Sequence, residues 1–232
     1  MAKFMKPIVR STCAAIVTAV LALVVAPLAS AQAEQQRLVD AADASLSNFM
    51  RDPEMGWLQQ NIGRAKGVLI APQLVKAGFI FGGSGGRAVL LARDPKSGQW
   101  VGPAFYAFAT ASVGFQAGIA VSESITLVMT DRSINSLLSP SFKIGGDASV
   151  AAGPVGAGAK SDIVADLIAF SRAKGIYGGL NLDGTFVNTS DDWNEAYYGV
   201  RVSSTDILVR MSVRAAGAEK LLASITKAAG RK

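Results

Sequence analysis

The residues of this chain best suited to binding chemistry are two identical pairs of cations. The tetrapeptide Arg-Ala-Lys-Gly occurs twice, at residues 64–67 and 172–175, and each copy opens a glycine-rich apolar stretch. On a β-strand, Arg64 and Lys66 would share one face, and so would Arg172 and Lys174. If the two segments were neighbours in a sheet, these four cations would form a ledge suited to phosphate. Arginine offers a planar fork there and lysine a point charge.

Two further cations in the first glycine-rich region, Lys76 and Arg87, complete the predicted site for an anionic headgroup. The spacing is equally compatible with solvated cations or with internal ion pairs, for example to Asp94 or Asp183. The sequence therefore leaves two interpretations open, a lipid-binding site and a structural repeat. The predicted lipid-binding residues are Arg64, Lys66, Lys76, Arg87, Arg172 and Lys174.

Catalytic and metal-binding chemistry has few suitable residues in this chain. It contains no histidine and a single cysteine, Cys13, which removes a Ser-His-Asp triad, a Cys-His pair and any ordinary zinc site. The aspartates at positions 147, 162, 166 and 183 show no motif spacing. We therefore expect a protein that is not an enzyme, with no cofactor and no metal.

Two glycine clusters imitate phosphate-binding loops. Residues 83–88 match the dinucleotide pattern G-x-G-x-x-A, but that mechanism requires a helix N-terminus directly afterwards. The sequence continues instead as AVLLARDPKSG, which is typical of a strand and a turn. Residues 153–158 are also interpreted as a plain loop, because no helix-forming phosphate signature follows.

The first 33 residues have the order of a secretory signal peptide. Three cations precede an uncharged apolar run over residues 14–26, and small-residue cleavage patterns follow at 29–31 and 31–33. The run is short for a membrane span, and an uncleaved anchor is the alternative. We expect export to the periplasm or cell envelope, or secretion, and a mature chain that begins at Gln32 or Glu34.

Removal of the leader changes the net charge. The whole chain has 23 Lys and Arg against 17 Asp and Glu, and three of the cations lie in the leader, so the mature charge is 20 minus 17, or +3. Such a small excess is weak evidence for an anionic partner and does not indicate nucleic-acid binding.

Residues 34–232 are predicted to form a single α+β domain. Apolar residues recur at helical spacing over 34–50, and Asp52 and Pro53 begin a second short helix that Gly63 is placed to end. Short glycine-broken runs then follow up to about residue 184, too closely spaced for crossover helices. They predict a strongly curved, mostly antiparallel, glycine-rich sheet that approaches a barrel, with flanking helices at both ends. The runs are VKAGFIFGG, GRAVLLAR, QWVGPAFYAFA, SVGFQAGIAV and SITLVMT.

The first helix could lie on a membrane surface or pack against the sheet. Its apolar face is well formed, but its polar face carries Glu34, Asp40 and Asp43 against Arg37 alone. Helices that bind anionic lipid usually carry lysine and arginine there, so this composition favours packing against the sheet.

Several blocks of the chain, in order, closely resemble the SYLF domain, also called the Ysc-type actin-binding domain. The blocks are RAKGVLIAPQLVKAGFIFGGSGGRAVLLARD, WVGPAFYAFATASVGFQAG, FKIGGDASVAAGPVGAGA, FSRAKGIYGGLNLDG and NEAYYG. The resemblance implies binding of membrane lipids, particularly anionic phosphoinositides, actin binding in some fungal members, and no enzymatic activity. The zinc-binding FYVE finger of some relatives is absent, because its cysteines and histidines are missing.

We therefore expect a non-enzymatic, exported domain that binds anionic membrane lipid by peripheral contact rather than by a span. After export, the expected target is anionic phospholipid or lipopolysaccharide of the envelope, or a host membrane. The alternative is a protein-interaction or scaffolding module of the envelope, as in the actin-binding relatives.

Overall fold

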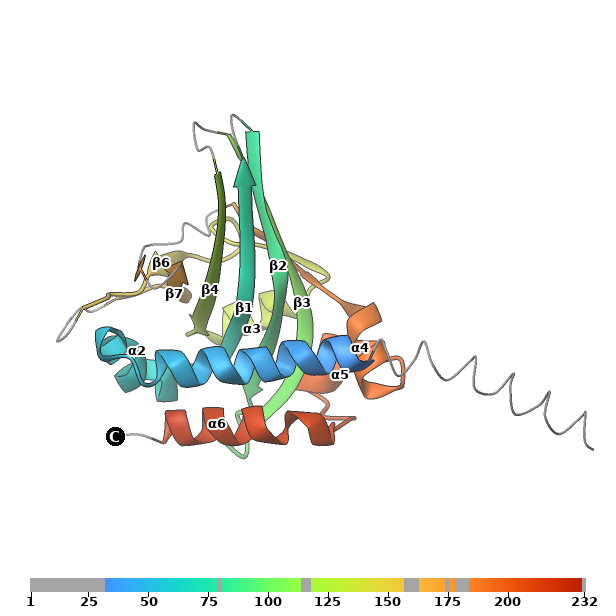
Figure 1. Cartoon of the computed structure of the whole chain (residues 1–232). Coiled ribbons are helices and arrows are strands. Elements are labelled where there is room, and N and C mark those ends of the chain that lie inside the picture. The colour runs from blue at the N-terminus through green and yellow to red at the C-terminus, as the bar shows by residue number, and fades with distance from the viewer. Residues whose placement is uncertain are drawn as a thin grey trace, which may run out of the picture.

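The fold is a curled sheet covered on one face by helices from both ends of the chain (Figure 1). The computed structural model describes residues 32–78, 81–113, 118–156, 163–173, 176–177 and 184–230. Within these residues nine strands pair in the order β5-β9-β3-β2-β1-β4-β7-β6, with β8 attached to β7. All the pairs are antiparallel except β6 with β7. The predicted α+β class and the mostly antiparallel, curved sheet are confirmed.

The strands are β1 (Gly67–Gly78), β2 (Phe81–Arg93), β3 (Trp100–Val113), β4 (Gly118–Val128), β5 (Ser141–Lys143), β6 (Val150–Ala152), β7 (Leu167–Ala173), β8 (Ile176–Tyr177) and β9 (Phe186–Thr189). The N-terminal helix covers residues 32–49. It is followed by η1 (Pro53–Met55), α2 (Gly56–Asn61), η2 (Ile62–Arg64), α3 (Asp131–Leu137), α4 (Asp191–Tyr198), α5 (Ser204–Leu208), η3 (Ala216–Ala218) and α6 (Glu219–Ala229).

Two of the predicted strand runs are wrong in their boundaries. VKAGFIFGG contains the end of β1 and the beginning of β2, and SVGFQAGIAV contains the end of β3 and the beginning of β4. The glycines in these runs mark strand ends as well as strand interiors, and composition alone does not separate the two cases. The predicted turn at Asp94 is confirmed, because its carboxylate accepts hydrogen bonds from the backbone N–H groups of Lys96 and Ser97 at 3.2 and 3.0 Å.

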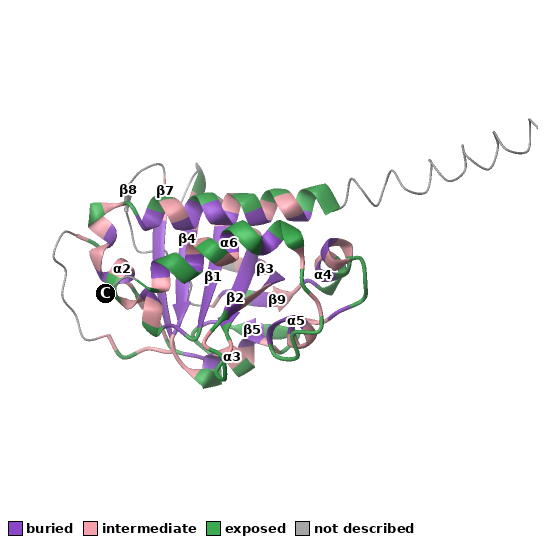
Figure 2. Ribbon diagram, turned by 90° about the horizontal axis from the view of Figure 1, so that it is seen from below, coloured by how far each residue is buried: buried purple, intermediate pink, exposed green. Residues whose placement is uncertain are grey.

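The N-terminal helix and α6 lie side by side across the lower half of one sheet face (Figures 1 and 2). The helix buries Val39, Leu46 and Phe49, each 1% exposed, in the core between helices and sheet. Burial of such side chains contributes about 1.5–3 kcal/mol each. Lys220 of α6 and Asp43 of the N-terminal helix form an ion pair at 2.9 Å, which joins the two helices. The prediction that this helix packs against the sheet is confirmed.

The short helices after the N-terminal helix follow the sequence signals only in part. The Asp52 carboxylate accepts from the N–H of Glu54 at 3.0 Å, so the predicted cap is confirmed. Gly63 does not end the helical segment, which continues through Arg64. A Cβ on Gly63 would lie 2.5 Å from the carbonyl oxygen of Ala229, so this glycine allows η2 to approach the end of α6. In the part of the chain that the structure describes, no helix is long and apolar enough to cross a membrane.

Candidate functional site

The two cations of the first Arg-Ala-Lys-Gly copy do not lie on a strand. Arg64 is the last residue of η2, Lys66 lies in a bend, and β1 begins at Gly67. Both cations are exposed: Arg64 donates to the side-chain oxygen of Asn61 at 3.0 Å, and the Lys66 amine is 3.5 Å from Asp131. The predicted alternation of this copy on a strand is therefore wrong.

The second copy contains a cation that is tied into the fold. Arg172 lies on β7 and forms ion pairs with Glu123 of β4 and, at 3.9 Å, with Asp52. Its side chain is 23% exposed, and its guanidinium lies 5.7 Å from the centre of the Phe49 ring. Glu123 also accepts from the hydroxyl of Ser45 at 2.7 Å. Arg172 thus links two strands to the N-terminal helix and to the cap of η1, whereas Lys174 lies outside the described residues.

The predicted ledge of four cations is wrong in its geometry. Strand β4 lies between β1 and β7, so the strands that adjoin the two copies are not neighbours. Gly67 and Leu167 both pair with Val128, which places the first copy level with the start of β7. Arg172 is five residues further along β7, or about 16 Å away along the strand. A repeated tetrapeptide carries no information about which strands pair.

The remaining predicted cations lie on opposite faces of the sheet. Arg87 points to the face that carries the helices, where its guanidinium lies 4.0 Å from the centre of the Trp193 ring and donates to the Ser190 hydroxyl at 3.2 Å. Lys76 belongs to the other face, because it alternates with Val75 along β1. Of the five predicted residues that the structure describes, only Arg87 and Arg172 share one face of the sheet, and both are engaged there with neighbouring side chains.

Above these arginines, the same sheet face continues as an exposed row of apolar residues that crosses five strands. Residues directly opposite each other in neighbouring strands point to the same face. Phe186 of β9 pairs with Ala109 of β3, Ala109 with Gly85 of β2, Gly85 with Val75 of β1, and Val75 with Val121 of β4. We call these five residues the apolar strip.

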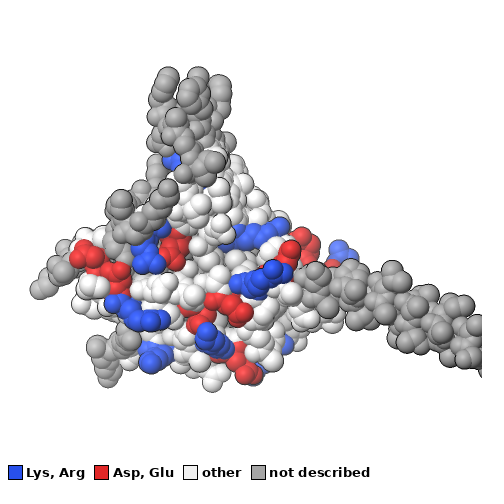
Figure 3. Space-filling model, in the orientation of Figure 1, with Lys and Arg blue, Asp and Glu red and all other residues white. Residues whose placement is uncertain are grey.

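The apolar strip is uncharged, and all its residues are exposed except Gly85, which is half-buried. Phe186 is 45% exposed, and Val75 and Val121 are each 40% exposed. The strip spans four gaps between strands, or about 19 Å. In Figure 3 the white area between the grey top of the molecule and the charged surface of the helices is nearly free of charged side chains. Sequence reasoning missed the strip because its residues come from five strands and meet only through the strand register.

A row of polar residues separates the strip from the helix-covered core. Gln73 and Arg87 are cross-strand partners, and each lies two residues from the strip along its own strand. Glu123 and Arg172 are partners in the same way, and Glu123 lies two residues from Val121 on β4. Because these side chains mark the edge of the buried core, the surface above them is not part of the packed interior.

Each of the shifted pKa values lies further from pH 7 than the ordinary value of the same group. Burial raises the pKa of Tyr197 to about 12. Hydrogen bonds from Ser203 lower the pKa of Asp206 to about 2. Hydrogen bonds from Thr130 and Ser149 lower the pKa of Asp166. Catalytic acids and bases are tuned towards the working pH, so none of these shifts suits proton transfer.

The described part of the chain also contains no cluster of metal-ligating residues. No group of three or more His, Cys, Asp or Glu residues there is placed to hold a metal ion.

The family model described as Las17-binding protein actin regulator, Ysc84, matches residues 109–228. These are 120 of the 232 residues, and they run from the end of β3 into the last turn of α6. The chain belongs to the Ysc84 family. Phe186, Ala109 and Val121 of the apolar strip fall within the region that matches the Ysc84 model, whereas Gly85 and Val75 precede it.

Curated relatives of the Ysc84 type are similar to this chain over most of its length. LAS seventeen-binding protein 3 of Saccharomyces cerevisiae is 33% identical over 152 residues, which cover 62% of this chain and 33% of the yeast protein. SH3 domain-containing YSC84-like protein 1 is 30% identical in Bos taurus and 29% in Homo sapiens, over 165 residues that cover 69% of this chain and 48% of each relative. The chain thus spans a third to a half of the length of these relatives, of which the yeast protein is named as a binding protein.

Proposed function

We propose that this chain binds anionic membrane lipid without converting it, and that the apolar strip is the surface that enters the apolar part of the membrane interface. The observation that supports the proposal is the exposure of Phe186, Val75 and Val121 in one uncharged row. Exposed apolar patches on a soluble fold mark sites of contact with proteins or membranes.

The electrostatic part of the proposal rests on cations outside the polar row. Arg87 and Arg172 are engaged inside the fold, so they hold the sheet in shape rather than contact headgroups. Lys76 is the nearest predicted cation that carries no ion pair among the described residues, and it lies one residue from Val75 on the opposite face. It can reach headgroups if the upper end of the sheet enters the interface edge-on. Each such cation contributes roughly 1 kcal/mol near an anionic surface.

The test is co-sedimentation with vesicles of phosphatidylcholine alone and of phosphatidylcholine mixed with phosphatidylglycerol. The double variant Val75→Thr, Val121→Thr keeps the side-chain shape and the β-propensity but makes the strip polar. Full burial of a valine is worth about 2 kcal/mol, and 40% of each side chain is still exposed, so the pair accounts for about 1.6 kcal/mol. We expect binding to both kinds of vesicle to weaken about fifteenfold.

The matched control is Val200→Thr with Val209→Thr. These valines are 51% and 52% exposed and lie outside the strip. Equal losses in the two double variants, or no loss in either, would show that the strip does not contact lipid.

A second candidate function is protein binding, in which the strip receives an apolar segment of a partner. The observation that favours it is the family, because the yeast relative is named for binding Las17. If the function is protein binding, the strip variants should bind a purified protein partner more weakly than the unchanged chain does. The unchanged chain should then not bind vesicles. We further propose that this function is carried out outside the cytoplasm, since the first 33 residues have the order of a signal peptide.

A further inference from the structure

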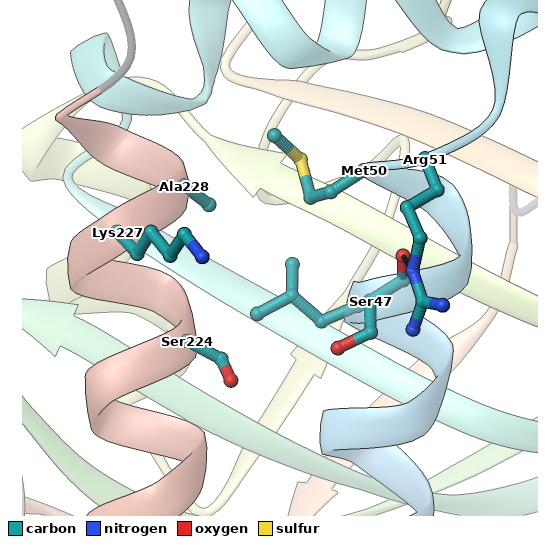
Figure 4. Close-up of a pocket in the computed structure, with 7 residues that line it drawn as sticks. Ser47, Met50, Arg51, Ser224, Lys227 and Ala228 are labelled. Carbon is teal, nitrogen blue, oxygen red and sulfur yellow. Dashed lines mark hydrogen bonds between the residues drawn. The ribbon is translucent and has the colours of Figure 1, made fainter.

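A separate groove lies between the N-terminal helix and α6, on the side of the helix away from the strip (Figures 1 and 4). Its volume is about 370 Å³. Two cations, two hydroxyl groups and an apolar floor line it, and there is no carboxylate among the described residues that form its wall. The lining residues are Leu46, Ser47, Met50, Arg51, Ser224, Lys227 and Ala228.

Three of the polar groups of the groove, the Lys227 amine and the two serine hydroxyls, approach one another from two helices. Figure 4 shows the Lys227 amine and the Ser224 hydroxyl on α6 pointing towards the N-terminal helix, and the Ser47 hydroxyl pointing back towards α6. Arg51 lies beside Ser47 at the rim. Among the described residues, the structure gives neither hydroxyl and neither cation an acidic partner. These donors are therefore available to an anion in the groove.

The two cations could serve only to neutralise helix ends, because the N-terminal helix and α6 both terminate beside the groove. Each helix C-terminus is equivalent to about −0.5 charge, so two termini against two cations leave about +1. Arg51 donates from Nε to the carbonyl oxygen of Ser47 at 3.1 Å, which occupies one of its five N–H groups. Lys227 donates to no carbonyl among the described residues. Contacts with the helix ends thus use only a small part of the hydrogen-bond donors of Arg51 and Lys227.

We propose that this groove binds the phosphate group of a phosphate ester, with Arg51 and Lys227 as charged donors and the Ser47 and Ser224 hydroxyls as neutral donors. The apolar floor of Leu46 and Met50 accommodates the carbon skeleton of the ester. A tetrahedral oxyanion accepts hydrogen bonds from several directions, which matches donors that converge from two helices. The proposal rests on the proposed lipid function for its source of phosphate, but a soluble phosphate ester has the same chemistry.

The experiment separates these two sources with two probes, glycerol 3-phosphate followed by NMR and vesicles of phosphatidylcholine with or without phosphatidylglycerol. Arg51→Ala with Lys227→Ala should weaken both glycerol 3-phosphate binding and binding to the anionic vesicles about thirtyfold. Binding to neutral vesicles should be unchanged. The matched control is Arg201→Ala with Arg214→Ala, which removes two exposed cations that are not among the residues lining the groove.

The variant Ser47→Ala with Ser224→Ala keeps the net charge and distinguishes a built site from general surface attraction. A hydrogen bond of this kind changes affinity about two- to tenfold, so the double change should weaken glycerol 3-phosphate binding at least about fourfold. Circular dichroism melts confirm that each variant is folded. The groove is not a phosphate site if the serine variant binds glycerol 3-phosphate as tightly as the unchanged chain does. The same conclusion follows if the control variant at Arg201 and Arg214 loses as much affinity for glycerol 3-phosphate as the variant at Arg51 and Lys227.

Failure of this site and failure of the proposed function give different results. Loss of glycerol 3-phosphate binding together with normal binding to anionic vesicles identifies a soluble ester as the ligand and removes the lipid source. Vesicle binding that depends on the strip, together with glycerol 3-phosphate binding that is unchanged in both groove variants, overturns the groove proposal and leaves the proposed function standing. If the unchanged chain does not bind vesicles but still binds glycerol 3-phosphate, the proposed lipid function is wrong and the groove proposal stands.

Discussion

Replacement of Arg172 by alanine should destabilise the fold, although the sequence pattern predicts that this arginine binds lipid. The change removes the cation that faces Glu123 and Asp52, whose side chains are only 16% and 19% exposed. Removing one member of a fully buried ion pair costs about 3–5 kcal/mol, because the partner is left charged and unpaired. With about a fifth of each carboxylate exposed, we expect about 2–3 kcal/mol. For a domain of this size that lowers the melting temperature by about 4–12 °C.

The assay is thermal and urea unfolding followed by circular dichroism. Arg64→Ala is the matched control, because Arg64 comes from the other tetrapeptide copy and donates only to Asn61 at the surface, so its removal should stay within about 0.5 kcal/mol. Combining Arg172→Met with Glu123→Gln removes both charges and should cost less than the sum of the two single changes. If the Arg172→Ala variant has the same melting temperature as the unchanged chain but no longer binds vesicles, Arg172 contacts lipid and our assignment of a structural role to it is wrong.

Three further predictions concern acid stability, backbone packing and export. The pKa values of Asp166 and Asp206 are lowered from the ordinary value of 3.8, so their contribution to stability is complete above about pH 4 and is lost as the pH falls through each lowered pKa, which is about 2 for Asp206. Because the chain has no histidine, unfolding free energies should be flat between pH 5 and 8, and a step near pH 6.5 would contradict this. Gly86→Ala should destabilise the sheet more than Gly85→Ala in a denaturation series, since a Cβ would lie 2.3 Å from the Gln73 carbonyl oxygen in the first case and 3.4 Å from backbone oxygen in the second. Chain exported from a secreting host should begin at residue 32 or 34 by intact mass, and a retained leader would instead favour an anchor.

The parts of the fold that the sequence predicts well are those set by neighbouring residues. The helical spacing of Leu46 and Phe49, the cap at Asp52 and the turn at Asp94 each depend on a few consecutive positions, and the structure confirms them. Gly199 ends α4 with a φ of 71°, a left-handed conformation that favours glycine. In these cases the local chemistry specifies the local conformation.

The parts that could not be predicted depend on strand pairing. The two tetrapeptide copies have the same sequence, yet Arg64 ends a helical turn and Arg172 lies in a strand between two carboxylates. Likewise, Arg51 and Lys227 meet only because the N-terminal helix and α6 pack together. Side chains from distant segments become neighbours through tertiary packing, which single-sequence patterns do not encode.

The central claim is that the apolar strip enters a lipid interface, and a fluorophore placed on the strip tests it most directly. Cys13 is the single cysteine in the sequence, so in a Cys13→Ser background Val75→Cys or Val200→Cys gives one labelling position. Both valines are exposed, at 40% and 51%, which makes the two positions comparable before lipid is added. With an environment-sensitive label, the account predicts a blue shift at position 75 and none at position 200 when vesicles of phosphatidylcholine and phosphatidylglycerol are added. A shift at position 200 alone, or no shift at position 75 under conditions where the chain co-sediments with those vesicles, would contradict it.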